Sequence, residues 1–400
     1  MRVLYLHQYF NTPQMSGGTR SYEMARRLVA MGHEVHLVTS RRSGGDEKGW
    51  SQTEEAGVTV HWLDVPYSNR MSYGQRMKAF ARFAAAAGPY ASKLPYDVVF
   101  ATSTPLTIAL PGVWAARRRR VPMVFEVRDL WPELPIAMGA LQNPVLRASA
   151  RALERFAYRN AAQIIALSPG MKDGVVRTGY PADRVHMIPN SCDTALFRDV
   201  AGGAEPFYAR HPHLRDKRVV MYAGTLGIIN GVDYLVRVAA ELRDPSVHVV
   251  IVGDGHERAA VEALARSLGV LGRSLTMAGR MPKAEMPHAL AAADVLTSLF
   301  VDLPEMWHNS ANKFFDALAS GTPVAINYGG WQAELLEAHP AGLRLPAGDP
   351  AAAARQLTAF LDAPDRVAAA QAEARRLATT TFDRDRLAGE LAVVLESATA

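Results

Sequence analysis

Short apolar runs alternate with amphipathic stretches along the whole chain. In the first half, the apolar runs occupy residues 2–7, 34–40, 58–63, 97–102, 122–127 and 162–168. The segments between them, such as 22–31 and 145–160, carry apolar residues at helical spacing. Strand and helix patterns in this alternation favour a parallel, doubly wound α/β sheet.

The same alternation starts again after a polar stretch with Gly and Pro at residues 198–216, which we interpret as a linker. A second series of strand patterns follows at 218–224, 246–253, 274–279, 293–299, 322–327 and 341–346. A chain of 400 residues is too long for one compact core and fits two domains. We therefore predict an N-terminal domain at 1–200 and a second α/β domain at 201–378, with amphipathic helices in the Ala-rich segment 349–400.

Composition indicates the class of protein and the compartment in which it resides, but not its activity. An apolar fraction of 49% and a charged fraction of 21% are typical of a globular protein. The single cysteine, Cys192, excludes a disulfide within the chain and a Cys-rich metal cluster, as expected in a reducing compartment. The first residues lack the pattern of a signal peptide, and the longest apolar stretch, 105–116, is short of the ~20 residues of a membrane span. We expect a cytoplasmic protein.

Charge is divided unevenly between the two halves. Residues 1–200 carry 25 Lys and Arg against 16 Asp and Glu, whereas the second half carries 19 against 23. Segment 66–120 has nine basic residues and one acid, Asp97. A one-sided basic field suits an anionic partner, either nucleic acid or phospholipid. The nine basic residues are Arg70, Arg76, Lys78, Arg82, Lys93 and the run from Arg117 to Arg120.

Two glycine pairs follow predicted strands, where open parallel sheets bind their ligands. Gly17 and Gly18 stand just before a predicted helix, so the backbone can approach a ligand and the helix N-terminus favours a phosphate. Gly253 and Gly255 stand in a similar position in the second domain. Such pairs are also common in simple turns. The Gly17 loop has no GxGxxG, which argues against a dinucleotide dehydrogenase.

Charged residues gather after the fifth predicted strand. Arg128, Asp129 and Glu133 lie there beside Trp131. Buried charges need partners, so an Arg128–Asp129 or Arg128–Glu126 pair is one interpretation. The other is a charged group that faces a reacting sugar or phosphate.

The segment 308–323 is the strongest candidate for a ligand site. Residues 309–312 precede a helix that is predicted to begin near Lys313, so free amides, the helix dipole and a cation coincide. Together they could hold a diphosphate, and the Asp316 carboxylate one turn later could accept hydrogen bonds from ribose hydroxyls. An amphipathic helix with a polar N-cap is the plain alternative.

This segment resembles the signature of glycosyltransferase family 4, whose members are retaining enzymes with the GT-B fold. The family's turn corresponds to residues 319–324, Ala-Ser-Gly-Thr-Pro-Val. Further matches are Gly17–Gly18, the Ile-Pro-Asn-Ser-Cys-Asp segment at 188–193, 224–226, 230–233 and 252–255, so the resemblance covers nearly the whole chain. It implies two facing Rossmann-like domains and a C-terminal helix at 379–400 that packs back on the N-terminal domain.

The chain departs from the family pattern at charged positions. His308 stands where the first glutamate of the Glu-x7-Glu pair is expected, and Asp316 takes the second position. The usual arginine and lysine for the diphosphate are Thr225 and Asn230, and Arg128 replaces the usual histidine after the fifth strand. These changes shift the expected charge onto Lys313 and Arg128. The segments LHQYFNTPQMSGGTR, FEVRDLWPELP and NKFFDALASGTPVAINYGGW are more specific and resemble the bacterial O-antigen and capsule branch that includes L-fucosamine (FucNAc) transferases.

The resemblance implies transfer from a UDP-sugar with retention of configuration and without a metal or other cofactor. It assigns catalytic roles to Arg128, Lys313 and His308, and acceptor contacts to Asp129, Trp131 and Glu133. The one Asp-x-Asp, at 383–385, is interpreted as a solvated helix start. The donor would be bound by Gly17, Gly18, Thr225, Asn230, Gly253, Arg280, Met281, Ser310, Ala311, Asn312, Lys313 and Asp316.

The implied acceptor is a polyprenyl-diphosphate-linked saccharide at the inner face of the plasma membrane. Tyr73, Met77, Phe80, Ala84 and Ala87 share one helical face, which either packs inward or lies on the membrane surface. We expect the basic N-terminal domain to contact anionic lipid and not nucleic acid, because no stacking aromatics interleave the basic stretch. A UDP-sugar 2-epimerase and a non-catalytic nucleotide- or glycan-binding module are the alternative functions.

Overall fold

A computed structural model describes residues 1–15, 17–42, 49–68, 71–197 and 200–400. Arg70 and the first residue of the expected linker, Arg198, lie outside the described residues, as does the side chain of Tyr73. The chain divides into two compact units. Unit 1 comprises Met1–Pro189, His308–Ser310 and Asp385–Ala400, and unit 2 comprises Asn190–Trp307 and Ala311–Arg384. The boundaries expected from the sequence were 200/201 and 378/379.

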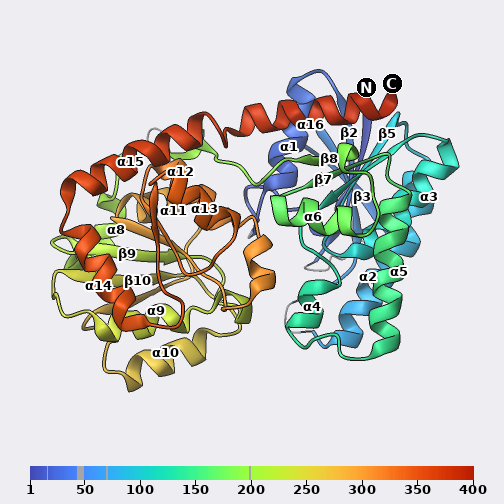
Figure 1. Cartoon of the computed structure of the whole chain (residues 1–400). Coiled ribbons are helices and arrows are strands. Elements are labelled where there is room, and N and C mark those ends of the chain that lie inside the picture. Colours follow the sequence, from blue (N-terminus) through green and yellow to red (C-terminus); the bar gives the residue numbers. More distant parts are fainter. Residues whose placement is uncertain (16, 43–48, 69–70, 198–199) are drawn as a thin grey trace. The chain divides into compact units, whose positions relative to one another are not determined.

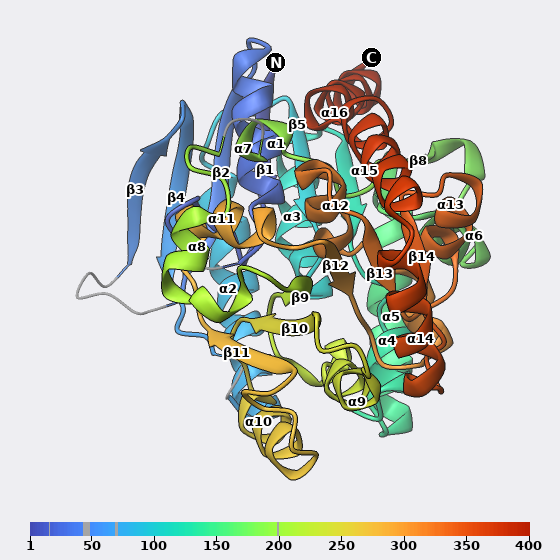
Figure 2. The same ribbon diagram turned by 90° about the vertical axis from the view of Figure 1, so that its left-hand side faces the viewer.

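Unit 1 is built on an eight-stranded sheet of order β3-β4-β2-β1-β5-β6-β7-β8. Neighbouring strands are parallel except β3 and β4, and β3 lies at the outer edge of the sheet in Figure 2. The central strands are buried along their whole length because helices cover both faces. The strands are β1 (Arg2–Leu6), β2 (Glu34–Arg41), β3 (Trp50–Glu55), β4 (Val58–Asp64), β5 (Val98–Thr102), β6 (Met123–Val127), β7 (Gln163–Ala166) and β8 (Val185–Met187).

The helices of unit 1, except α4, bury part of their surface in the unit. In α2, Phe80 and Ala84 are buried and Ala87 is fully enclosed in the core. The amphipathic face expected at 73–87 therefore packs inward, and the membrane-lying interpretation of this helix is wrong. The helices are α1 (Arg20–Ala30), α2 (Tyr73–Ala91), α3 (Ala109–Arg119), α4 (Glu133–Ala137), α5 (Pro144–Arg159), α6 (Pro169–Arg177) and α16 (Arg384–Thr399).

The C-terminal helix α16 groups with unit 1 from Asp385 onward. Leu387, Leu391 and Leu395 recur at helical spacing and belong to the core of unit 1. Both chain termini lie at the same end of unit 1, as Figure 1 shows. No helix in the described parts of the chain is long and apolar enough to cross a membrane.

Unit 2 is built on a six-stranded parallel sheet of order β11-β10-β9-β12-β13-β14. In chain order this is 3-2-1-4-5-6, the arrangement of a Rossmann fold. The strands are β9 (Arg218–Ala223), β10 (Val247–Val252), β11 (Leu275–Gly279), β12 (Val295–Ser298), β13 (Val324–Ile326) and β14 (Gly342–Arg344). Strand patterns in the second half of the chain are thus confirmed.

Helices complete unit 2, and one of them replaces the expected linker. Helix α8 (Glu205–Arg210) has Pro206 in its first turn and buries Phe207, so the polar stretch after residue 200 is folded into unit 2. The other helices are α7 (Thr194–Phe197), α9 (Asp233–Glu241), α10 (Arg258–Ser267), α11 (Met286–Ala291), α12 (Asn312–Ser320), α13 (Trp331–Ala338), α14 (Pro350–Leu361) and α15 (Pro364–Thr379).

Candidate functional site

The sheet of unit 2 has a switch point between β9 and β12, the first and fourth strands of the series. Chain connections leave these two neighbours in opposite directions, which opens a crevice beyond their carboxyl ends. Gly224 and Thr225 follow β9 there, and the connection after β12 leads into α12. Residues from both connections meet around the side chain of Lys313.

Lys313 is held by neighbours from the first strand of unit 2. Its Nζ donates to Oδ1 of Asn230 at 3.2 Å and lies 5.3 Å from the ring centroid of Tyr222. The same Asn230 amide donates through Nδ2 to the Thr225 carbonyl, and the Tyr222 hydroxyl donates to that carbonyl as well. Burial lowers the pKa of Lys313 to about 8. The lysine is therefore a fixed cation that lacks full solvation, which suits it to an anionic ligand.

Glycines are required where these loops meet. A Cβ on Gly224 would lie 2.2 Å from Cε of Lys313, so only glycine leaves room for the lysine stem. A Cβ on Gly253 would lie 1.8 Å from the Gly224 carbonyl oxygen, and Gly253 also has φ of 145°. The glycines after β9 and β10 thus pack backbone against backbone beside Lys313. Sequence spacing indicated both glycines but not their mutual contact.

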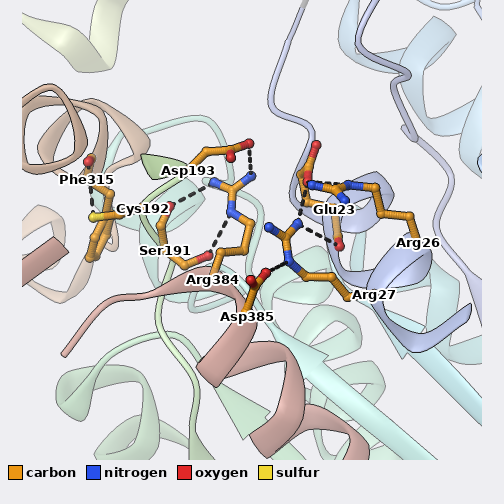
Figure 3. A network of polar contacts seen from close by, with 9 residues as sticks. All are labelled: Glu23, Arg26, Arg27, Ser191, Cys192, Asp193, Phe315, Arg384 and Asp385. Carbon is orange, nitrogen blue, oxygen red and sulfur yellow. Dashed lines mark hydrogen bonds and ion pairs between the residues drawn. The ribbon is translucent and has the colours of Figure 1, made fainter. Parts of the chain in front are cut away.

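Asp316 lies three residues after Lys313 on α12. Burial raises the pKa of Asp316 to about 6, and the positive charges of Arg384, Lys283 and Lys313 limit the rise. Arg384 in turn donates to the Ser191 carbonyl at 2.8 Å and pairs with Asp193 at 3.3 Å (Figure 3). A carboxylate in this setting can accept hydrogen bonds from hydroxyl groups of a ligand.

The N-terminus of α12 has no side-chain cap. Ala311 is the N-cap residue, and its methyl group cannot accept a hydrogen bond from the first-turn amides. Asn312 is exposed at the first helical position, whereas Ser310 is buried and groups with unit 1. The amide end of α12 thus carries a partial positive charge close in sequence to Lys313.

The contacts of His308 lie in unit 1, and its expected catalytic role stays a prediction. His308 groups with unit 1, where its carbonyl accepts from the Ser168 hydroxyl at 2.5 Å. Its ring packs against the first turn of α6, since a Cβ on Gly170 would lie 1.9 Å from its Nδ1. Asp316 belongs to unit 2. The expected His-x7-Asp pair is therefore divided between the two units.

Three other expected donor residues lie at strand ends of unit 2. Thr225 is exposed directly after Gly224, and Arg280 and Met281 follow β11. Strand β11 is the edge strand on the β10 side of the sheet, two positions from the switch strand β9. A ligand that reaches from Lys313 to Arg280 would therefore extend along the carboxyl edge of three strands.

In unit 1, Arg128 follows β6 and does not form either of the ion pairs considered from the sequence. Its guanidinium lies 3.4 Å from Nε2 of His7, which follows β1. Burial and the Arg128 charge lower the pKa of His7, so this imidazole is neutral. Asp129 instead accepts from the Thr104 hydroxyl at 3.0 Å, and burial raises the pKa of its carboxyl.

The carboxylate of Glu126 is paired with Arg20. The two side chains are almost completely buried and lie 2.8 Å apart, and Arg20 also donates to the carbonyls of Ile188 and Pro189. Burial alone would raise the pKa of Glu126, but Arg20 holds it below the usual value. This pair was missed in the sequence because its members are 106 residues apart. Because Arg20 is the ion-pair partner of Glu126, Arg128 is not needed for that purpose.

The remaining acceptor-side candidates lie close to Arg128 in sequence but differ in environment. Trp131 packs against the core of unit 1. Glu133 is exposed and pairs loosely with Arg177 at 3.5 Å. Glu133 is therefore a surface group and Trp131 a core-packing one, a difference that their common position after a strand end did not indicate, and their expected contact with the acceptor stays a prediction.

Gly17 and Gly18 precede α1 as expected. Gly17 has φ of 122°, and Nδ2 of Asn11 lies 2.7 Å from the place of a Cβ and donates to the Gly18 carbonyl at 3.2 Å. A side chain at Gly17 would be strained by both backbone and space. Gly17 is thus required to shape this loop.

Asp385, the second acid of the Asp-x-Asp segment, forms an ion pair within unit 1. Asp385 pairs with Arg27 of α1, and Arg27 also pairs with Glu23, as Figure 3 shows. Within the described residues, no group of three or more His, Cys, Asp or Glu side chains is arranged to hold a metal ion. Independence of a metal stays a prediction.

Comparison with known proteins shows which domains the chain resembles. Residues 17–191 match the glycosyl transferase 4-like domain, and residues 217–363 match glycosyl transferases group 1. The chain is 24% identical over 277 residues to the putative colanic acid biosynthesis glycosyl transferase WcaI of Escherichia coli, covering 65% of this chain and 67% of the relative. It is 27% identical to a GDP-mannose-dependent alpha-mannosyltransferase of Mycobacterium tuberculosis, covering 84% and 82%.

Solved structures agree on the fold. Anabaena HepE, crystallised in complex with UDP and glucose, superposes with a TM-score of 0.73 at 18% identity, covering 99% of this chain and 100% of that one. Two parallel-sheet α/β units of this kind form the GT-B fold. The chain belongs to the family 4 type of glycosyltransferases and transfers a sugar.

Proposed function

We propose that the protein moves a sugar from a UDP-linked donor, with retention of configuration and without a metal, to a polyprenyl-diphosphate-linked saccharide. The observation that carries this proposal is Lys313, a half-buried cation fixed by Asn230 beside an uncapped helix N-terminus. Buried cations and free amides are the means by which a protein neutralises a diphosphate when no metal does so. HepE, which has UDP bound, supports the choice of nucleotide.

Donor binding would use the groups that surround the unit 2 switch point. Lys313 and the first-turn amides of α12 would bind the diphosphate, and the glycines after β9 and β10 would let it approach the backbone. Asp316 would accept hydrogen bonds from the ribose, which requires its ionised form. Arg280 and Met281, at the end of β11, would contact the base.

The chemical step would be transfer at the front face of the donor sugar. A bond forms between the acceptor oxygen and the anomeric carbon, the bond from that carbon to the phosphate oxygen breaks, and the acceptor proton passes to the leaving phosphate. Lys313 would stabilise the charge that develops on this phosphate. Arg128, beside the neutral His7, and the neighbouring Asp129 would bind the acceptor.

The biological setting follows from the relatives and from the sequence motifs. WcaI bears the name of colanic acid biosynthesis, a bacterial polysaccharide, and the motifs resemble those of L-FucNAc transferases. We infer an N-acetylated deoxyhexosamine donor and synthesis of a surface polysaccharide, such as O-antigen or capsule, at the inner face of the plasma membrane.

A thermal-shift panel of UDP-, GDP- and dTDP-sugars tests the donor, because a bound ligand stabilises the fold by mass action. We expect UDP-sugars to raise the midpoint most and UDP-L-FucNAc to exceed UDP-glucose. A larger shift with GDP-mannose than with any UDP-sugar would contradict the proposal. Product analysis by NMR tests retention, and conversion of donor to an epimer without acceptor would indicate an epimerase instead.

A further inference from the structure

Three helices of unit 1 form a layer of almost uniform positive charge. Helix α2 contacts α3, and α3 contacts α5. Together the three helices contain ten Lys or Arg and a single acid, Glu154. Glu154 is buried, and burial raises the pKa of its carboxyl to about 7. The exposed surface of this layer therefore has little negative charge to offset its arginines.

The arginines of α3 and α5 are not neutralised by neighbours. Arg117 donates to the Asn160 side chain at 2.6 Å, and Arg119 donates to the Ser92 carbonyl at 3.2 Å. In the described part of the chain, none of Arg117–Arg120, Arg151, Arg155 and Arg159 lies within ion-pair distance of a carboxylate. Their charge is available to an external partner.

The arginines of the two helices converge on an open depression. Arg117 and Arg120 line it from α3, and Arg159 lines it from the end of α5. Val113 and Met123 supply apolar walls. Three guanidinium groups around an apolar depression suit a phosphate that is attached to an apolar body.

Exposed apolar side chains lie in the same helices. Leu110 is 43% exposed and Trp114, one turn later on α3, is 56% exposed. The Trp114 ring rests against α2, since a Cβ on Gly88 would lie 3.1 Å from it. Val145 and Leu146 are exposed at the start of α5, at 69% and 45%. Large apolar groups among arginines are typical of surfaces that enter the headgroup region of a bilayer.

We propose that the α3–α5 face, formed by Leu110, Trp114, Arg117–Arg120 and the first turn and arginines of α5, docks on an anionic phospholipid bilayer. The aliphatic groups favour lipid over nucleic acid, which offers no apolar interior for Leu110, Val145 and Leu146. Arginines would contact lipid phosphates while Trp114 and Leu110 enter the interface. The proposal rests on the proposed function only in that a lipid-linked acceptor would lie in this bilayer. It assigns docking to α3 and α5 and not to α2, whose apolar face is buried.

Vesicle flotation measures docking directly. One set of vesicles contains phosphatidylcholine alone, and the other contains about 30 mol% phosphatidylglycerol, which makes the surface anionic. We expect the wild type to float only with the anionic vesicles and to be released as salt rises. The variant R151Q/R155Q/R159Q should lose at least about tenfold in partitioning. The matched control R273Q/R355Q/R366Q removes the same charge from exposed positions of unit 2 and should bind like wild type.

A second variant separates insertion from charge. Trp114→Ala should weaken binding several-fold, and the blue shift of tryptophan emission on adding anionic vesicles should be absent. Equal loss in the two triple variants would overturn the proposal, because binding would then follow net charge. Tighter binding to polyuridylate than to anionic vesicles, with the same dependence on Arg151, Arg155 and Arg159, would overturn it in favour of RNA.

The outcome is distinguishable from failure of the proposed function. Thermal shift by UDP-sugars involves residues of unit 2 and should be unchanged in R151Q/R155Q/R159Q. Donor binding without flotation of the wild type would refute docking alone. Flotation that depends on these arginines, in a protein that binds no UDP-sugar, would support docking and refute the proposed donor.

Discussion

Units 1 and 2 have the same sheet order around their first strand but different chemistry at the switch point. In unit 1, β1 lies between β2 and β5, and in unit 2, β9 lies between β10 and β12. The first strand of unit 1 leads to a neutral His7 beside Arg128, and a separate buried pair, Arg20–Glu126, joins α1 to β6. The first strand of unit 2 ends beside Lys313, which lacks a carboxylate at hydrogen-bonding distance among the described residues.

This difference teaches how one scaffold can be adapted to two kinds of ligand. A half-buried cation beside glycines and an amide suits a diphosphate, whose charge it offsets. A neutral imidazole and a guanidinium with polar neighbours suit hydroxyl groups, which accept and donate hydrogen bonds. Unit 2 is therefore the donor-binding candidate and unit 1 the acceptor-binding candidate, and four predictions test this division.

The largest expected effect is on the stability of unit 1. Arg20→Ala leaves the Glu126 carboxylate buried without its cation and should cost about 3–5 kcal/mol of unfolding free energy. Urea unfolding measures it. The double variant R20M/E126Q should regain most of the loss, since no unpaired charge remains. A loss below about 1 kcal/mol in R20A would show that Glu126 is not held by this pair.

The next effect is on catalysis at unit 2. Lys313→Ala should lower the rate of sugar transfer by about 10²–10³-fold, because the leaving phosphate loses its nearest cation. The control is Lys217→Ala, which removes a lysine directly before β9, at the amino end of that strand, where its Nζ donates to the Pro245 carbonyl. Transfer should be unchanged in the control. Similar rates in both variants would end the assignment of the donor to this switch point.

A smaller effect tests the space around the lysine. Gly224→Ala places a methyl group 2.2 Å from Cε of Lys313, so the lysine must move, at a cost of about 1–3 kcal/mol in UDP affinity or stability. Calorimetry with UDP and urea unfolding separate the two. The control Gly348→Ala is in the same unit and meets no atom within 4 Å. If G224A binds UDP like wild type, UDP binding does not depend on the position that Lys313 has beside Gly224.

The smallest effect is a pH dependence that only unit 2 should show. The pKa of Lys313 lies at about 8, so its charge is lost as the pH rises through that value. UDP affinity should be level below pH 8 and fall up to tenfold per pH unit above it. Because the folded pKa lies below the unfolded value of 10.5, fold stability itself should rise from pH 8 to 10.5, the opposite direction.

Lys313→Arg provides the control for this pH profile. Arginine stays charged throughout the range, so UDP affinity should be weaker but level up to pH 10. Binding measured by calorimetry from pH 7 to 10 gives both profiles. A decline of equal slope in wild type and K313R would assign the titration to another group.

Much of the fold could be predicted from the sequence because strands buried on both faces have continuous apolar runs. Twelve such runs correspond to strands of the two sheets. Strand β3 was missed because its residues, Trp-Ser-Gln-Thr-Glu-Glu, are mostly polar and it is an exposed edge strand. Strand β8 was missed because its three residues, Val-His-Met, form no apolar run and only Val185 is buried. The prediction of a linker was wrong because the buried side chain of Phe207 packs α8 into unit 2.

The candidate site was predicted in part. The glycines could be found because they follow strand ends, where ligands bind in open sheets, and Lys313 because it stands at the start of a helix. Tyr222 was missed because it lies within strand β9. His7 was missed because it was included in the apolar run 2–7 that predicted β1. The role of Asn230 could not be read from spacing, since its contact with Lys313 joins residues 83 positions apart.

The sequence alone determined two α/β domains, the family, and a cation at the start of α12, because periodicity and motif spacing are local properties. Only the tertiary structure decided that Asn230 and Tyr222 hold this cation, that Glu126 belongs to Arg20, and that His308 groups with unit 1. It also turned the apolar face of α2 inward and left Trp114 of α3 exposed. These are contacts between distant segments, and their free energy depends on burial and on partners that no local pattern specifies.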